Sequence, residues 1–227
     1  MSWNEYHGRV TRAFDEWRMT DRDIRGFLRF SLRIANEAYT RIWDEASREP
    51  AYDDSPELVD VFHDRIEGIW ENDYRWMLLS GGLIGAVTAF DVYLEKAIEE
   101  VLRRHGHTAT GYTNEKALSW EEATDFYKRA LGVRLKGHQD LSDVRDLRHI
   151  LTHKRGELRT HDQRKRFGKD PDGWIGDNVE LTLDSTLDYM DVLARHVERV
   201  DKVAYEAAWG SASPATLADY IAAKRRP

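Results

Sequence analysis

The stretch Leu83–Val101, with the sequence LIGAVTAFDVYLEKAIEEV, is the most apolar part of this 227-residue chain. Its apolar residues recur at alternating spacings of four and three, which places them on one face of an α-helix. They are Leu83, Val87, Phe90, Leu94, Ala97 and Val101. So regular a stripe is typical of the seam of a helical bundle or a dimer. The pattern therefore predicts a long core helix over about residues 75–104, with Ser80-Gly-Gly82 permitting another backbone to approach closely.

Helical spacing is also present before this stretch. Thr20-Asp-Arg-Asp23 has the composition of a helix start, and the apolar spacing after it continues until Pro50 interrupts the pattern. A second helix is expected to follow, with Ser55 as its N-cap and Pro56 at its first position. The chain before residue 75 is therefore predicted to form an N-terminal helical extension.

Further helices are predicted after the apolar stretch. Ser119-Trp-Glu-Glu122 is a capping box that should begin a short helix, which Gly132 closes. Later helices are expected over residues 140–155, with Gly156 as the stop, over 183–205, and from Ser213-Pro214 onward. Between them, the alternation around Trp174 and residues 179–183 predicts a small hairpin within a loop.

Together these segments predict an all-α, up-and-down helical bundle. We expect three parts: an N-terminal helical extension over residues 1–74, the bundle over 75–205, and a short helix and tail over 206–227. The chain has no cysteine, which excludes disulfides and thiolate chemistry. It lacks the basic and apolar regions of a signal peptide at its start, and we expect no membrane-spanning segment. The expected location is the cytoplasm.

Basic residues concentrate in one region of this acidic chain, whose formal net charge is −7. Residues 145–166 carry eight basic residues against three acidic ones. The basic residues are Arg145, Arg148, Lys154, Arg155, Arg159, Arg164, Lys165 and Arg166. The overall charge argues against indiscriminate nucleic-acid binding, but such a patch could guide a phosphate backbone to one place. A solvated loop is the alternative interpretation. Arg145, Lys154, Arg155 and Arg159 are the candidate RNA-binding residues.

The segment Arg148-His-Ile-Leu-Thr-His153 lies inside this region. It resembles the Arg-polar-x-x-x-His signature of HEPN domains, all-helical modules that include many metal-independent ribonucleases. The resemblance covers residues 75–205, and Asp91, after Phe90 on the apolar helix, is similar to an aromatic–acid pair that many members keep. It implies a HEPN-like bundle that pairs as a homodimer, acts on RNA without a cofactor, and serves prokaryotic defence or a toxin–antitoxin system with a partner protein.

The chemistry of the segment can also be argued from its residue types. Cleaving RNA without a metal requires a group with a pKa near neutrality, which suits an imidazole, and a fixed cation to hold the phosphate, which suits a guanidinium. His153 is therefore expected to be the general acid or base and Arg148 the phosphate clamp, with His149 as a further catalytic candidate. The products would be a 2′,3′-cyclic phosphate and a 5′-hydroxyl end.

Helical geometry sets a condition on this hypothesis. Five residues turn through about 500° of helix, which leaves Arg148 and His153 about 140° apart around the axis. Either the helix end distorts near Gly156, or two chains pair so that their motifs line one cleft.

The residue types leave two alternatives open. His149 and His153 stand one helical turn apart and could hold a metal, although no third ligand lies at motif spacing. The chain could also be a non-catalytic HEPN-like module that binds a partner protein or a nucleotide.

Overall fold

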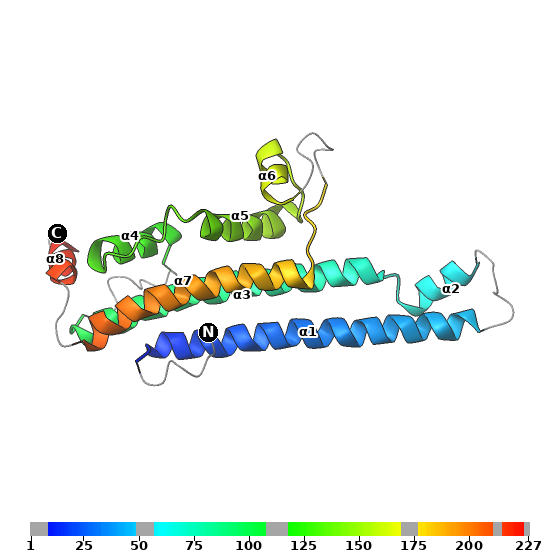
Figure 1. The fold of residues 1–227 in the computed structure, drawn as a ribbon, viewed down its shortest axis with the longest axis horizontal. Coiled ribbons are helices and arrows are strands. Elements are labelled where there is room, and N and C mark those ends of the chain that lie inside the picture. The colour runs from blue at the N-terminus through cyan, green and yellow to red at the C-terminus, as the bar shows by residue number, and fades with distance from the viewer. Residues whose placement is uncertain (1–8, 49–56, 108–117, 169–176, 211–214, 225–227) are drawn as a thin grey trace.

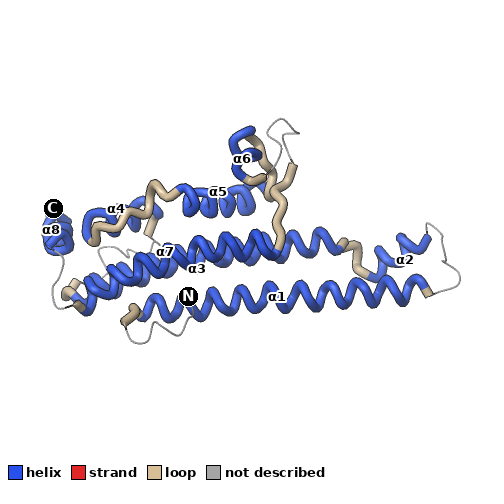
Figure 2. The backbone as a smooth tube through the Cα atoms, viewed as in Figure 1, coloured by secondary structure: helices blue, strands red, loops and turns tan. Residues whose placement is uncertain are grey.

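The computed structural model describes residues 9–48, 57–107, 118–168, 177–210 and 215–224, and these residues form helices with no strand among them. The helices are α1 (Arg12–Ser47), α2 (Glu57–Arg65), α3 (Glu71–Arg104), α4 (Trp120–Ala130), α5 (Gln139–Lys154), α6 (His161–Arg166), α7 (Leu183–Trp209) and α8 (Ala215–Lys224). Figure 2 shows how little of the described chain lies outside them. The predicted all-α class is therefore confirmed.

Three long helices, α1, α3 and α7, lie side by side, and α4 and α5 form a row along the outer side of α3 and α7 (Figure 1). The helix α1 runs opposite to α3, α5 returns in the direction of α1, and α7 runs with α3. The order of α1, α3, α5 and α7 is therefore up, down, up, down, and the short helix α4, which precedes α5, runs opposite to it. This is the arrangement expected of a bundle whose consecutive helices are joined at the same end.

The helix α1 belongs to the same hydrophobic core as the rest of the bundle. Phe14, Trp17, Leu28 and Leu32 of α1 are buried together with the apolar stripe of α3 and with α7. At the other end of the chain, α8 buries Leu217 and Tyr220 in that core as well. The boundaries expected at residues 74 and 205 therefore do not separate distinct cores, and α1 is one of the bundle's own helices.

The helix α1 begins at Arg12, with Thr11 as its N-cap, rather than at the expected Thr20-to-Asp23 start. The Thr11 hydroxyl accepts a hydrogen bond from the Phe14 N–H at 3.0 Å. Glu100 of α3 accepts hydrogen bonds from the N–H groups of Arg12 and Ala13, at 3.0 and 3.3 Å. These partners come from tertiary structure as well as from the local sequence, so the helix begins before the start that the sequence pattern predicts.

The sequence predicts that another helix approaches the backbone at Ser80-Gly-Gly82. The helix α1 does so, at Gly82. A Cβ at Gly82 would lie 2.6 Å from Cδ2 of Leu28, a fully buried residue of α1. A Cβ at Gly81 would meet nothing within 4 Å. Gly82 therefore lets α1 pack directly against the backbone of α3.

Other local expectations had mixed outcomes. The capping box at Ser119 and Glu122 is present. The expected hairpin is wrong for the described residues, because α6 forms inside that loop, Leu183 begins α7, and only an isolated bridge joins Glu157 to Asn178. The segment pairs too few backbone groups to make a strand. Trp174 and the expected helix starts at 55–56 and 213–214 lie outside the described residues.

The helix α3 bears on the expectation that no segment spans a membrane. It is long and apolar enough to cross a bilayer, with a mean hydropathy of 1.6 over its most apolar 18-residue window. Half of that window is buried inside the protein. The core helix of a bundle can have the same length and hydropathy as a membrane-spanning helix, because burial on several sides also requires apolar residues.

A buried carboxylate ties the start of α1 to α7. Asp201 accepts hydrogen bonds from the Thr11 hydroxyl at 2.5 Å and the Tyr93 hydroxyl at 3.2 Å. Its side chain is almost completely removed from solvent. Burial raises the pKa of Asp201 from 3.8 to about 6, although these hydrogen bonds oppose the shift.

The two neighbouring glycines of α3 give a matched pair of substitutions. Gly81→Ala should raise the free energy of unfolding by up to about 1 kcal/mol, because alanine favours the helix and the added methyl group has space. Gly82→Ala should lower it, by about 1–3 kcal/mol relative to Gly81→Ala, because the methyl group overlaps buried Leu28. Urea unfolding of both variants measures the difference. Equal stability would show that α1 does not pack on Gly82.

The raised pKa of Asp201 predicts a pH dependence of stability. The folded state holds the Asp201 proton up to about pH 6, whereas the unfolded chain releases it near 3.8. The free energy of unfolding should therefore fall as pH rises from about 4 to about 6. Asp201 should contribute at most about 3 kcal/mol to this fall. Asp201→Asn should remove this component in urea titrations across the window. Asp188→Asn, at an exposed position of the same helix, is the control and should keep it.

Candidate functional site

The sequence motif lies on the second half of α5, on the outer side of the α3–α7 pair (Figure 1). Its apolar residues face the core: Leu141, Val144, Leu147, Ile150 and Leu151 are all buried. The polar positions between them are left at the surface or at its edge, including Arg148, His149 and His153. The amphipathic pattern of α5 is therefore what holds the motif on a fixed backbone.

Arg148 is half-buried, and its Nε atom is inaccessible to solvent. This Nε has no hydrogen-bond partner among the described residues. A buried donor without a partner costs about 1–3 kcal/mol, and more when the group is charged. A rotation of the Arg148 side chain toward the surface would let this donor meet an acceptor on a ligand.

His149 and His153 are exposed and their rings face each other, with centroids 4.8 Å apart. The helix α5 continues through Lys154, so the backbone leaves Arg148 and His153 about 140° apart around the axis. The distortion considered from the sequence is absent before His153. One chain therefore brings the two histidines together but does not aim Arg148 and His153 at one atom.

Asp91 and Arg145 join the apolar helix to the motif helix. They form an ion pair between α3 and α5, and the Arg145 guanidinium lies over the Trp120 ring, 3.8 Å from its centroid. Both partners of Arg145 belong to the protein itself. Arg145 therefore orients α5. The sequence predicts that Arg145 binds RNA, but its guanidinium is occupied by Asp91 and the Trp120 ring.

The other basic residues of the cluster divide into paired and open ones. Arg159 pairs with Glu157 at 2.7 Å. Arg166 pairs with two aspartates of α5, and Arg164, almost fully buried, pairs with Asp177 at 3.2 Å. Among the described residues, Arg148, Lys154, Arg155 and Lys165 form no ion pair. The fold thus neutralises half of the expected basic patch, leaving open cations around the end of α5.

Arg155 lies at the rim of a groove of about 1060 Å³ between α3, α5 and the segment before α7. Its backbone is left-handed, with φ 51°, and it ends α5 one residue before the expected stop at Gly156. Gly156 also has positive φ, and its Cα hydrogens face the Trp76 ring. The indole N–H of Trp76 donates to the Val179 carbonyl at 3.3 Å. This packing fixes the end of the motif helix.

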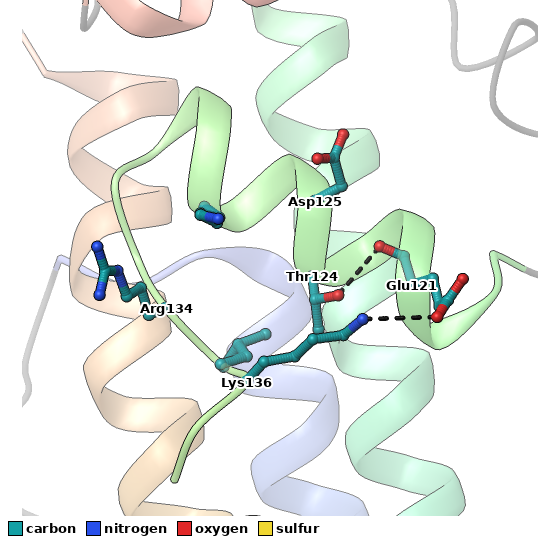
Figure 3. Close-up of a pocket in the computed structure, with 7 residues that line it drawn as sticks. Glu121, Thr124, Asp125, Arg134 and Lys136 are labelled. Atoms are coloured by element: carbon teal, nitrogen blue, oxygen red, sulfur yellow. Dashed lines mark hydrogen bonds and ion pairs between the residues drawn. The ribbon is translucent and has the colours of Figure 1, made fainter.

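A second group of polar residues, missed in the sequence, surrounds the start of α5. His138, just before α5, and Asp140 of α5 meet His196 and Arg199 from α7. These residues are 56 or more positions apart between the two helices, so no local spacing signals their meeting. Next to them, a hollow of about 580 Å³ lies between α4 and the segment leading to α5 (Figure 3). An ion pair of Glu121 with Lys136, at 3.6 Å, crosses it.

Comparison with protein-family models, with curated proteins and with solved structures finds no match to this chain. Its function is therefore inferred from the residues and their geometry.

The end of the motif helix gives a testable pair of variants. Arg155→Gly should raise the free energy of unfolding by about 1 kcal/mol, because a left-handed backbone is unfavourable for a residue with a Cβ. Gly156→Ala should lower it by about 1–3 kcal/mol, because the new Cβ would lie 2.6 Å from Cζ2 of Trp76. Urea unfolding measures both. A stabilising Gly156→Ala would contradict the packing of Gly156 against the Trp76 ring.

Proposed function

We propose that the protein is a metal-independent endoribonuclease of HEPN type. The observation that supports this most directly is the buried Nε of Arg148, without a partner in the described chain, one residue from a pair of exposed histidines. Turning this guanidinium outward to a phosphate oxygen would give the unpartnered Nε a hydrogen bond, and imidazoles at the surface are within reach of a substrate.

The reaction would divide between these groups. His153 accepts the proton of the ribose 2′-hydroxyl as the 2′-oxygen attacks phosphorus and the bond to the 5′-oxygen breaks. A protonated imidazole, His149 or His153 of the second chain, returns a proton to the departing 5′-oxygen. Arg148 holds the non-bridging oxygens, where charge builds in the transition state. The products carry a 2′,3′-cyclic phosphate and a 5′-hydroxyl.

A homodimer would complete this site. Because α5 keeps Arg148 and His153 on different sides of its axis, a second motif related by a twofold would supply the missing group. Part of the outer surface of α5 is available for such pairing, since α3 and α7 pack against its inner side and α6 reaches it through the pairs of Arg166 with Asp143 and Asp146 (Figure 1). Arg155 and Lys154, at the end of the same helix, would contact the RNA backbone.

The biological setting proposed for this activity is prokaryotic defence or a toxin–antitoxin system in the cytoplasm, with an antitoxin or another defence protein as partner. A ribonuclease that cuts cellular RNA requires restraint, which such a partner would provide. This setting rests on the HEPN resemblance of Arg148 to His153.

A second candidate function is that of a non-catalytic helical module that binds a partner protein. The observation in its favour is a set of exposed apolar residues on the face of α1 turned away from the core: Met19, Phe27, Phe30 and Ile34. Apolar groups gathered on one exposed face favour a protein contact. This face lies on the opposite side of the α3–α7 pair from α5 (Figure 1), so pairing of two chains through α1 would not bring their motifs together.

The test is RNA cleavage in EDTA by the purified full chain and by His153→Ala, His149→Ala and Arg148→Ala. The wild type should cut structured RNA and tRNA and leave 2′,3′-cyclic phosphate ends. His153→Ala and Arg148→Ala should each reduce the rate at least about 100-fold, since removal of a general base or of a charge-stabilising group has effects of this order. His161→Ala, an exposed histidine of α6, is the control and should cleave normally.

Several outcomes would reject the proposal. Equal or equally absent cleavage by wild type and His153→Ala would remove it. Sedimentation showing only monomers at concentrations where cleavage occurs would remove the shared cleft. Biological activity that survives both Arg148→Ala and His153→Ala would favour the non-catalytic module.

A further inference from the structure

The polar group at the start of α5 lies far from the motif. His138 precedes α5 and Asp140 is in its first turn, whereas His153 is near its last residue, about 22 Å further along the helix axis. His196 comes from the middle of α7 and is buried. One ligand atom from each of His138, Asp140 and His196 lies within 4.8 Å of the other two. This group is independent of the proposed ribonuclease site.

The spacing of these atoms is close to that of ligands around one ion. Nε2 of His196 lies 3.2 Å from an Asp140 carboxylate oxygen. Two ligands at Zn²⁺ bond lengths of about 2.0 Å are separated by about 3.3 Å in tetrahedral geometry. The two imidazole rings of His138 and His196 lie with centroids 5.0 Å apart. His138 can therefore reach the same point with a change of side-chain torsion.

The protonation states also suit a ligand set. Burial lowers the pKa of His196, although its hydrogen bond with Asp140 opposes this shift. Burial acts to raise the pKa of Asp140, but hydrogen bonds from His196 and from the Leu141 N–H outweigh it, and the pKa is lowered. Metal ligands bind in their deprotonated forms, and both shifts act in that direction.

The Arg199 guanidinium lies against both histidines, where a bound metal ion would also lie. Its guanidinium lies 2.8 Å from Nε2 of His138 and 3.2 Å from Nδ1 of His196. It also donates to the Arg134 carbonyl at 3.0 Å. Since Arg199 is exposed, its side chain can leave without disturbing the core. An ion on Nε2 of His196 would place the ring proton on Nδ1, where it would displace the Arg199 donor.

We propose that His138, Asp140 and His196 bind a divalent transition-metal ion of the Zn²⁺ type, with Arg199 as a competing cation. Two imidazoles and one carboxylate leave a position open for water, as in catalytic zinc sites and in two-histidine, one-carboxylate iron sites. Nitrogen ligands exclude a preference for Mg²⁺ or Ca²⁺. The ion joins the start of α5 to the middle of α7, so its binding stabilises the bundle.

The experiment titrates Zn²⁺ into the chelator-treated full chain and follows binding by calorimetry and the midpoint of thermal unfolding. We expect one ion per chain and a higher unfolding temperature. His138→Ala should weaken binding at least about tenfold, as loss of one ligand from a three-ligand site requires. The fold should survive this change, because the His138 side chain makes no cap hydrogen bond. Helical circular dichroism checks this.

Two further variants distinguish this site from metal binding elsewhere on the chain. Arg199→Ala should bind Zn²⁺ several-fold more tightly, because it removes the competing cation; unchanged or weaker binding would contradict Arg199 as a competitor. The double variant of His149 and His153 to alanine is the matched control, since that pair also stands within metal-binding distance. If this control loses the ion, or if wild type and His138→Ala bind equally or not at all, the proposed site is wrong.

Discussion

The bundle depends on the burial of α3 on several sides. Its apolar face packs against α1, α7, α5 and α4, and twelve of its residues are removed from solvent. The approach of α1 is possible because Gly82 has no side chain where Leu28 lies. Since every other long helix is placed by its contact with α3, the position of α5, and of the residues it carries, follows from this one packing arrangement.

The core also determines which charges remain available at the surface. Arg145 is drawn to Asp91 on α3, and Arg164 and Arg166 are held by aspartates near them. These pairs orient α5 and α6 and remove much of the positive field that the sequence suggests. What remains is a small set of cations near the end of α5, together with two exposed histidines. This set is suited to holding one phosphate group, and less so to covering a length of nucleic acid.

Histidines gather at both ends of α5, but the two groups differ in their surroundings. His149 and His153 are exposed and lie on one helix. His196 is buried between helices, where its ring is fixed by Asp140 and by Arg199. Burial with defined partners suits a ligand, whereas exposure suits a proton-transfer group. The same residue type would therefore serve different chemistry in the two proposed sites, at the two ends of one helix.

The sequence by itself determined the helical class, the core helix and the motif helix, because apolar spacing and capping residues such as Ser119 act over a few neighbouring positions. It also located Arg148, His149 and His153 on one helix and Asp91 on the apolar helix. Only the tertiary structure decided that α1 starts at Thr11 and belongs to the core, that half of the basic patch is neutralised, and that His138 and Asp140 meet His196. Those outcomes depend on contacts between residues far apart in the chain, which local spacing does not encode.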